Sequence, residues 1–522
     1  MDVSDATIDA EFASSLETAL LVSLCTPSIE VCQNVTACIG MVLEEHALRA
    51  TADSSRAFTW VSYNRAVYQD LVSPEFRFTG LVAFQKRMRG LLRRMQHPTL
   101  GILAAWETAF DKWIHLVKEV STTSVDGVDD KVLAEWRNFS GFLASLGGTC
   151  TADQGPPLDE PFPEDMRWID RVCSDHYEES PLTRYLRLSI QLLGCSNVKV
   201  REAMRDVLSS EIPPVLYPPL FRALESELDV LLTGALASAD KGHESEIIFA
   251  EQAASVLKTM VERLESPGDL GASSSVHLGA LTLNLARFID GAQDSANMQR
   301  VKIRISNLCE AVTKRKEYLN LRDDVRIRNK LLEYIFGWIA RPHSTKADQQ
   351  PLLGPRHDDG RRIQRDLDKA CLKCLADLTS RLPLQPIDNQ PDADTSEMKS
   401  QMFHTYFNRF LSLLNYETKD SGKLEYPPAA ADREETMSNS DLVITVLSNL
   451  LSANIDVGLK HSLNIGYHEN IEIRAAFIKV LYNILLQGKE FSSLTDLAVS
   501  EKYEALFNVS RGHAGQCRCA IC

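Results

Sequence analysis

The sequence predicts an all-α fold, and three observations support that prediction. Apolar residues recur every three or four positions along most of the 522 residues. A convincing alternation of apolar and polar residues, joined by tight Asn-Gly or Asp-Gly turns, is missing from the sequence. A short polar residue, followed three positions later by a β-branched residue and then by Arg, opens several of the expected helices. Together these patterns indicate a long array of amphipathic helices.

The clearest periodicity lies toward the C-terminal end. An apolar face begins at Asp441 and breaks near Asn454, and a shorter helix then runs to about Gly466. A third apolar stripe begins at Ile473, and Gly488 is its expected C-terminal stop. Similar runs occupy residues 14–24, 100–118, 182–194, 246–264, 276–289, 300–314, 325–340, 363–380 and 397–415.

The helix-start pattern occurs three times, as Asn197-Val-Lys-Val200-Arg201, Asp324-Val-Arg-Ile327-Arg328 and Asn470-Ile-Glu-Ile473-Arg474. We expect the polar residue to cap each helix and the β-branched residue to be buried. The pattern resembles the second helix of HEAT repeats, where the polar residue and the arginine meet those of adjoining repeats. An ordinary capped helix is the simpler interpretation of one instance. Three instances favour a HEAT/armadillo-like α-solenoid of degenerate helical-hairpin repeats, since no fixed period is present.

The expected solenoid has interruptions. Residues 1–150 are predicted to form its N-terminal helical segment and residues 165–340 a run of HEAT-like repeats. A loop or insertion at 341–362, which holds many charges and prolines, separates these repeats from a second set of HEAT-like helices at 363–507. Residues 508–522 form an atypical tail in which the helical pattern stops.

Composition excludes several classes of function. Hydrophobic residues make up 44% of the chain and charged residues 24%, so the chain can bury a core. The net charge of −15 argues against general nucleic-acid binding, which needs a basic surface. The acidic N-terminus is not a secretory signal, and no stretch approaches the ~18 apolar residues of a membrane span. We expect a cytoplasmic protein without an integral membrane segment, with peripheral association at membranes as the alternative.

Catalytic and metal-binding patterns are missing from the sequence. There is no phosphate loop, nucleophile elbow or H-E-x-x-H pair, so no catalytic, cofactor-binding or metal-ligating residue is predicted. Cys371 and Cys374 have C-x-x-C spacing inside a helical pattern, which favours core packing. The basic segment Lys86–Arg94 favours a solvated helix face, with a phosphoinositide or an acidic partner as the alternative. His404 and His468 are interpreted as structural histidines.

The last residues contain three closely spaced cysteines. The four residues from Cys519 to Cys522 partly fit a C-a-a-X prenylation signal, with Cys519 as the acceptor. The terminal Cys is a poor final residue for that signal and no polybasic run precedes it. A metal site is a second interpretation. A tail that was never selected, from a misplaced gene end or a retained intron, is the interpretation that we favour.

A set of segments occurs in order between about residue 80 and residue 507. They are Glu135–Gly148, Leu216–Phe221, Val276–Gly279, Arg328–Tyr334, Leu382–Pro386, Lys399–Phe403, Ser448–Ser462, Gly466–His468 and Arg474–Gly488. In this order they resemble the helical region immediately N-terminal to the catalytic domain of neurofibromin-type Ras GTPase-activating proteins. The resemblance implies a HEAT/armadillo-like solenoid that leads into the GTPase-activating domain.

In that family the catalytic domain supplies an arginine finger to the Ras active site, which is worth about 10³–10⁵ in rate. The loop-and-helix motif of the finger is not found in this sequence. Arg511-Gly512 is superficially similar to it, but no surrounding helical domain would hold this arginine. The resemblance therefore implies a chain without catalytic residues of its own.

The expected function is regulation of Ras-type small GTPase signalling, with this chain as the non-catalytic helical scaffold. The implied partner is a Ras-like GTPase, reached through the missing catalytic domain, and self-association of the solenoid is a further expectation. One alternative is an active Ras GTPase activator as the full-length gene product. Another is a lipid-anchored adaptor that uses Cys519.

Overall fold

The computed structural model describes residues 3–52, 61, 63–74, 80–122, 129–151, 180–237, 244–264, 277–290, 296–316, 319, 321, 324–339, 355–385, 395–420 and 437–491. Within these ranges every regular element is helical and none is a strand, which confirms the all-α prediction. The chain divides into two compact units, Met1–Val276 and His277–Cys522.

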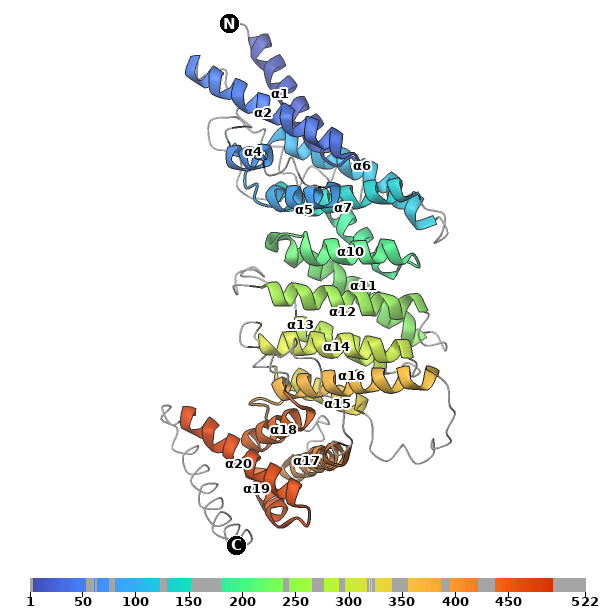
Figure 1. Ribbon diagram of the computed structural model, residues 1–522, viewed down its shortest axis with the longest axis vertical. Coiled ribbons are helices and arrows are strands. Elements are labelled where there is room, and N and C mark those ends of the chain that lie inside the picture. Colours follow the sequence, from blue (N-terminus) through green and yellow to red (C-terminus); the bar gives the residue numbers. More distant parts are fainter. Residues whose placement is uncertain are drawn as a thin grey trace. The chain divides into compact units, whose positions relative to one another are not determined.

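Figure 1 shows the helices of the first unit. They are α1 (Val3–Ser23), α2 (Ile29–Ala52), α4 (Arg65–Val72), α5 (Leu81–Leu92), α6 (Leu100–Thr122), α7 (Asp130–Cys150), α9 (Pro181–Gln191), α10 (Val198–Ser210), α11 (Tyr217–Ala237) and α12 (Glu244–Arg263).

Large aromatic side chains fill the core of the first unit, where α6 packs on α1, α7 and α9. Trp106 and Trp113 of α6 are fully buried, and their indole N–H groups donate to the Leu143 carbonyl (3.0 Å) and the Ser140 hydroxyl (2.8 Å) of α7. The buried Tyr185 hydroxyl donates to the Ser140 carbonyl at 2.7 Å. These polar tips are satisfied, so the rings can contribute their full apolar area to the core.

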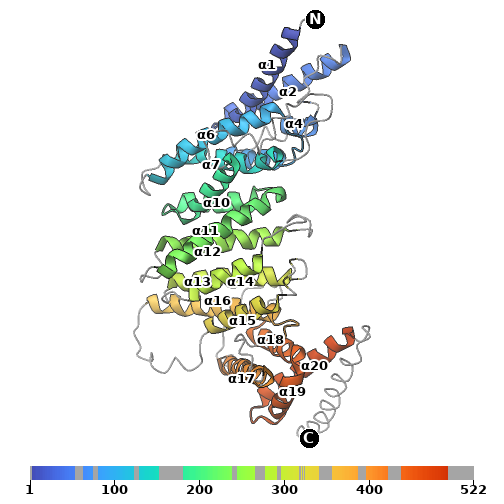
Figure 2. The ribbon, with the colours of Figure 1, turned by 180° about the vertical axis from the view of Figure 1, so that it is seen from behind.

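The helices of the second unit form closely packed pairs, and α14 lies beside α16 in both views (Figures 1 and 2). Its helices are α13 (Leu278–Asp290), α14 (Ala296–Lys314), α15 (Val325–Trp338), α16 (Pro355–Leu378), α17 (Thr395–Asp420), α18 (Asn439–Ala453), α19 (Ile455–Ser462) and α20 (Ile471–Phe491).

Two helix boundaries differ from simple expectation. α16 begins at Pro355, inside the predicted 341–362 segment; proline suits the first helical turn because its missing N–H has no intrahelical partner there. Gly488 was expected to end the last helix, and this prediction is wrong because α20 continues to Phe491. Glycine lowers helix stability without forbidding the conformation, so a strongly apolar helix can extend past it.

Helix length and composition also bear on membrane spans. Within the described residues, no single helix is both long and apolar enough to cross a membrane. One bent pair, Asn439–Ala453 with Ile455–Tyr467, meets the length and composition criteria together, with a bend of 111° between its halves.

Candidate functional site

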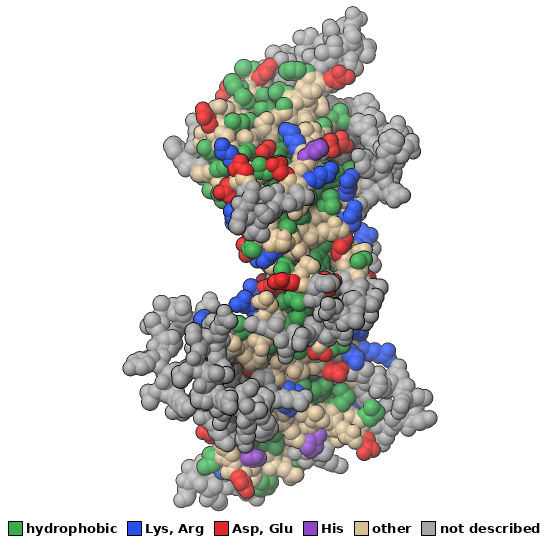
Figure 3. All heavy atoms as spheres, turned by 90° about the vertical axis from the view of Figure 1, so that its right-hand side faces the viewer, with side chains coloured by type: hydrophobic (Ala, Val, Ile, Leu, Met, Phe, Trp, Pro, Cys, Tyr) green, Lys and Arg blue, Asp and Glu red, His purple; other side chains and the backbone are tan. Residues whose placement is uncertain are grey.

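The basic segment Lys86–Arg94 of α5 is largely committed to contacts within its own unit. Arg89 forms an ion pair with Glu211 (Nε to Oε1, 3.4 Å), and each of the two side chains is only 9% exposed. Arg94 donates to the Asp70 carboxylate at 2.8 Å on the surface. Figure 3 shows basic and acidic side chains interspersed on one face of the protein. Arg89 and Arg94 therefore bind carboxylates of the protein itself.

Two arginines cap the C-terminus of α10. Arg93, the residue that follows α5, donates to the Ser210 carbonyl. Arg263, at the end of α12, donates to the Ser209 carbonyl at 2.7 Å. The last carbonyls of a helix lack intrahelical partners and carry partial negative charge, so cations are favoured there. The C-terminus of α10 thus joins α5 to α12.

The buried Arg89 lies directly across Gly141 of α7. A Cβ atom at position 141 would collide with the Cδ and Nε atoms of Arg89. Burial lowers the pKa of the Arg89 guanidinium, and the charge of Glu211 opposes that shift. An uncompensated buried charge is costly, so Arg89 depends on Glu211 to stay buried and charged.

The C-terminus of α16 is capped in a similar way but inside the second unit. Arg328 of α15 is 1% exposed and donates to the carbonyls of Leu378 (2.8 Å) and Ser380 (2.7 Å). Lys316 also donates to the Ser380 carbonyl, at 3.3 Å. This helix end therefore receives two cations from elements outside α16.

Asn329, the residue after Arg328, holds the segment that follows α16. Its Nδ2 donates to the carbonyls of Val325 (2.9 Å) and Pro383 (3.0 Å). Its Oδ1 accepts from the Gln385 backbone N–H at 3.3 Å. One buried amide therefore satisfies three backbone groups, two of them in the connection after α16.

Two asparagines of the α18 region bind the end of α16 and the connection that follows it. Asn454 Oδ1 accepts from the Leu384 N–H at 2.8 Å, and Asn454 Nδ2 donates to the Leu382 carbonyl at 3.1 Å. Asn449 Nδ2 donates to the Ala376 carbonyl at 2.7 Å. Arg328, Asn329, Asn449 and Asn454 thus form one set of buried side chains that bind the end of α16 and its connection, and we call this set the α16 clasp.

A further arginine caps α15. Arg409 of α17 donates to the Ile339 carbonyl, at the C-terminal end of α15, at 3.0 Å. Its guanidinium carbon lies 4.1 Å from the centre of the Phe336 ring, in the geometry of a cation–π contact. Arginines from neighbouring helices therefore bind the C-terminal ends of α10, α15 and α16.

The three predicted helix starts have different outcomes. Asn197 and Asn470 cap their helices, accepting from the backbone N–H groups of Lys199 (3.0 Å) and Glu472 (2.8 Å). Asp324 makes no side-chain cap. The cap prediction is confirmed for the two asparagines and is wrong for Asp324.

The arginines of these starts also differ. Arg201 donates back to the carbonyl of Ser196 (2.9 Å), and Arg474 donates back to that of Glu469 (3.1 Å), so each stays within its own helix start. Arg328 instead reaches another helix.

The burial of the β-branched residue also differs among the three helix starts. Val200 and Ile473 are buried as predicted, whereas Ile327 is only half-buried, so its prediction is wrong. At this start the neighbouring Arg328 is the buried residue. Its two hydrogen bonds to the end of α16 offset the cost of removing the guanidinium from water.

The C-x-x-C pair packs in the core, as predicted. Cys371 and Cys374 are fully buried on α16, and Cys371 Sγ lies 3.5 Å from the Ser306 hydroxyl of α14. Burial raises the pKa of the Cys371 thiol to about 12, so this thiol stays protonated and unreactive at neutral pH. Among the described residues, no group of histidine, cysteine or acidic side chains could hold a metal ion.

A buried acid that the sequence did not reveal lies in the first unit. Glu17 of α1 accepts hydrogen bonds from the hydroxyls of Tyr68 and Thr99, each at 2.6 Å. Burial raises the pKa of Glu17 to about 7, although both hydrogen bonds act to lower it. Its hydrogen bonds join α1 to α4 and to the start of α6.

The other residues singled out in the sequence are either exposed on the surface or lie outside the described part of the chain. His404 and His468 are exposed; His468 Nδ1 accepts from the Asn470 N–H at 3.1 Å, which supports a structural role. Cys519, the candidate lipid acceptor, lies outside the described residues, as does Arg511.

Segments that carry the family resemblance meet within each unit. In the first unit, Gly147 of segment 135–148 lies so close to Leu216 of segment 216–221 that a Cβ would be 3.0 Å from its Cδ1. In the second unit, the α16 clasp consists of residues from segments 328–334 and 448–462 and binds segment 382–386. The resemblance therefore rests on residues that hold helices together.

Comparison with known proteins agrees with this pattern. The chain is 24% identical over 463 residues to "Inhibitory regulator protein IRA2" of Saccharomyces cerevisiae, covering 87% of this chain. It is 25% identical over 444 residues to "Inhibitory regulator protein IRA1" of the same yeast, covering 81%. The chain spans only 14% of the length of each relative. No family model matches the chain. The two matches confirm the resemblance to neurofibromin-type Ras GTPase activators.

Proposed function

We propose that this chain, a region related to neurofibromin-type Ras GTPase activators, is a non-catalytic helical scaffold within a regulator of Ras-type small GTPase signalling. The observation that carries the proposal is the commitment of its buried arginines to structure. Arg89 is paired with Glu211, and Arg328 binds two backbone carbonyls. A catalytic arginine must instead point at the phosphoryl oxygens of a bound nucleotide.

The proposed architecture is a HEAT/armadillo-like α-solenoid. Its support is the packing of successive helices within each unit and the arginines that bind the C-terminal ends of neighbouring helices. In such an array each repeat contacts mainly its neighbours, and these caps are contacts of that kind. We propose that the array positions a catalytic domain and offers a surface for self-association.

The proposed partner is a Ras-like GTPase, reached through a catalytic domain outside these residues. The proposed location is the cytoplasm, with peripheral association at membranes as an alternative. Support comes from the two yeast relatives, whose names describe inhibitory regulators.

The experiment is a single-turnover assay of GTP hydrolysis by Ras, with residues 1–522 in excess. We expect no measurable stimulation, because catalysis needs an arginine held rigidly within hydrogen-bonding distance of the phosphoryl oxygens. Stimulation of about a hundredfold that one Arg→Ala change abolishes would contradict the proposal, since a true finger is worth that much or more.

A second candidate is an active GTPase activator as the full-length gene product. The 14% coverage of both relatives favours it, since most of their length has no counterpart in these residues. Purified full-length product and residues 1–522 should be compared in the same assay. GTPase stimulation by the full-length product, with none by residues 1–522, would support both proposals. This chain would then be the non-catalytic part of an active GTPase activator. The adaptor that uses Cys519 stays a prediction, because this cysteine lies outside the described residues.

A further inference from the structure

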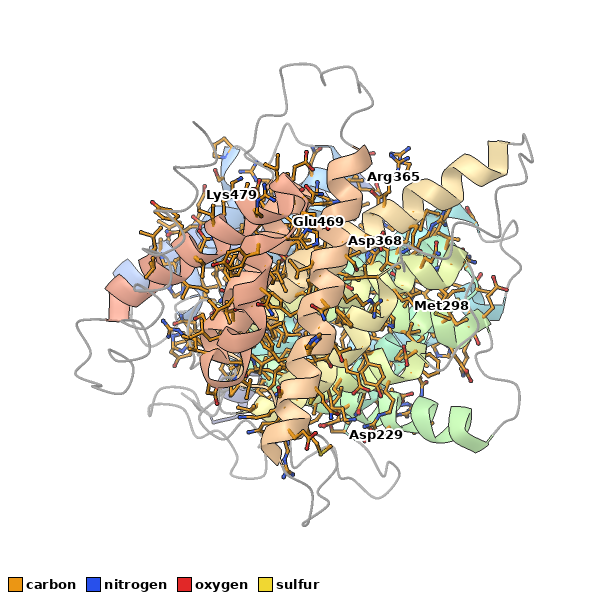
Figure 4. The ribbon with its side chains drawn as sticks, turned by 90° about the horizontal axis from the view of Figure 1, so that it is seen from below. Asp229, Met298, Arg365, Asp368, Glu469 and Lys479 are labelled. Atoms are coloured by element: carbon orange, nitrogen blue, oxygen red, sulfur yellow. The ribbon has the colours of Figure 1, made fainter. Side chains whose placement is uncertain are left out.

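The guanidinium of Arg89 is buried, unlike surface charges such as Arg365 and Lys479 (Figure 4). Its Nε lies 3.4 Å from the Glu211 carboxylate, which is an ion-pair contact without hydrogen-bond geometry. Its terminal Nη1 is also buried and has no hydrogen-bond partner among the described residues. A guanidinium nitrogen can only donate, so Nη1 requires an acceptor.

A buried acceptor lies one turn earlier on α5. Gln85 is 1% exposed, and its Nε2 donates to the Leu24 carbonyl at 2.7 Å. A carbonyl can only accept, so this hydrogen bond fixes which end of the Gln85 amide is Nε2 and which is Oε1. Oε1 is buried and has no hydrogen-bond partner within the part of the chain that the structure describes.

The unpartnered donor and the unpartnered acceptor lie in one region, beside the end of α1. Residues four apart on a helix are neighbours, with Cβ atoms about 5–6 Å apart, and the Cα–Cβ bond of Arg89 tilts toward Gln85. Burial raises the pKa of the Cys25 thiol, and the positive charge of Arg89 opposes that shift. The guanidinium is therefore close to Cys25, the residue that follows Leu24.

Helix α7 closes the other side of this region. A Cβ atom at Gly141 would collide with Cδ and Nε of Arg89, so the Arg89 side chain lies against the α7 backbone. Asn138, one turn earlier on α7, is buried and donates to the Cys25 carbonyl at 3.2 Å. The polar region is therefore enclosed by α5, α7 and the end of α1.

We propose that one internal water molecule lies between Gln85 and Arg89, where it accepts from Nη1 and donates to Oε1. Water can accept and donate at once, so a single molecule satisfies both atoms. Leaving a buried polar atom unpaired is costly, and internal waters are found where such atoms meet. An anion would suit Nη1 but not Oε1, and the nearby carboxylate of Glu211 would repel it.

A crystal structure of residues 1–522, at a resolution that shows ordered water, tests the proposal directly. We expect a density peak at hydrogen-bonding distance, about 2.7–3.2 Å, from both Arg89 Nη1 and Gln85 Oε1. A direct hydrogen bond between the two side chains, the lack of a peak, or a peak that refines as an anion would overturn the proposal.

Oxygen-17 magnetic relaxation dispersion supplies a second measurement, because it counts the water molecules that stay inside a protein for longer than the protein tumbles. Gln85→Met keeps the length of the side chain and removes the acceptor. We expect the dispersion amplitude to fall by the contribution of one water molecule. Gln191→Met makes the same replacement at an exposed position of the first unit and should leave the amplitude unchanged.

Equal amplitudes in Gln85→Met and the unchanged chain, or the same decrease in both variants, would overturn the proposal. Far-UV circular dichroism checks that each variant is folded. The crystal structure requires no substitution, so it decides the proposal even where Gln85→Met does not fold.

Discussion

The C-terminal ends of α10 and α16 are both capped by arginines from other helices, but the capping arginines differ in burial. At α10, the capping Arg263 is exposed, and the nearby buried charge of Arg89 is balanced by Glu211. At α16, the capping Arg328 is buried and binds backbone carbonyls, with neutral asparagines around it. The buried Arg89 is thus balanced by a carboxylate, whereas the hydrogen bonds described for the buried Arg328 go to backbone carbonyls.

The largest expected effect comes from removing the charge balance in the first unit. Glu211→Gln leaves the Arg89 guanidinium buried beside a neutral side chain, and we expect a loss of about 3–5 kcal/mol in the free energy of unfolding. Urea denaturation followed by circular dichroism measures it. The double variant Glu211→Gln with Arg89→Met should recover much of the loss; no recovery would show that the ion pair is not the cause.

Removing the buried cap in the second unit should cost slightly less. Arg328→Met eliminates two hydrogen bonds from a charged donor, and we expect a loss of about 3 kcal/mol. The matched control is Arg263→Met, which removes an exposed cap from α10 and should cost under about 1 kcal/mol. Equal losses in the two variants would remove the distinction between the two helix ends.

Glu17 makes the first unit sensitive to pH. Burial raises its pKa to about 7 from an ordinary value of 4.5, so the folded chain keeps a proton that the unfolded chain releases. The stabilising contribution is complete below pH 4.5 and is lost as the pH rises through 7. The loss is on the order of 3 kcal/mol.

The control for this prediction is Glu17→Gln, which keeps the shape of the side chain and cannot titrate. Unfolding measured from pH 4.5 to pH 7.5 should show a smaller decrease in stability for this variant than for the unchanged chain. Identical pH profiles would contradict the assigned role of Glu17.

The smallest expected effect concerns one amide of the α16 clasp. Asn454→Leu keeps a similar size without adding charge but removes the acceptor for the Leu384 N–H and the donor to the Leu382 carbonyl, for a loss of about 1–3 kcal/mol. Hydrogen exchange should become faster around residues 382–385 and stay unchanged near α10. A change spread equally over the two units would argue against a local clasp.

Much of the fold could be predicted from the sequence. The apolar runs at 100–118 and 325–340 correspond to α6 and α15, and the C-x-x-C pair proved to be core. These predictions succeed because helical periodicity and short-range capping depend on neighbours in the chain. Asn197 and Asn470 were predictable for the same reason, since each binds a backbone group two residues away.

A second, exposed apolar face of α20 is also visible in the sequence, although only the buried stripe was predicted from it. Ile471, Ile478, Tyr482 and Leu486 follow the helical period as clearly as the buried set does. Periodicity states which residues share a face, but it does not state whether that face is covered.

The sequence by itself determined the helical fold class, the family resemblance and the local caps, because each depends on residue order or on contacts within a turn of helix. Tertiary structure alone decided that Arg328 is buried while Ile327 is not, that Glu17 meets two hydroxyls, and that Asn329 and Asn454 bind one connection. These outcomes join residues that are 50 to 82 positions apart in the sequence, and the energy of a buried polar group depends on which partner lies beside it.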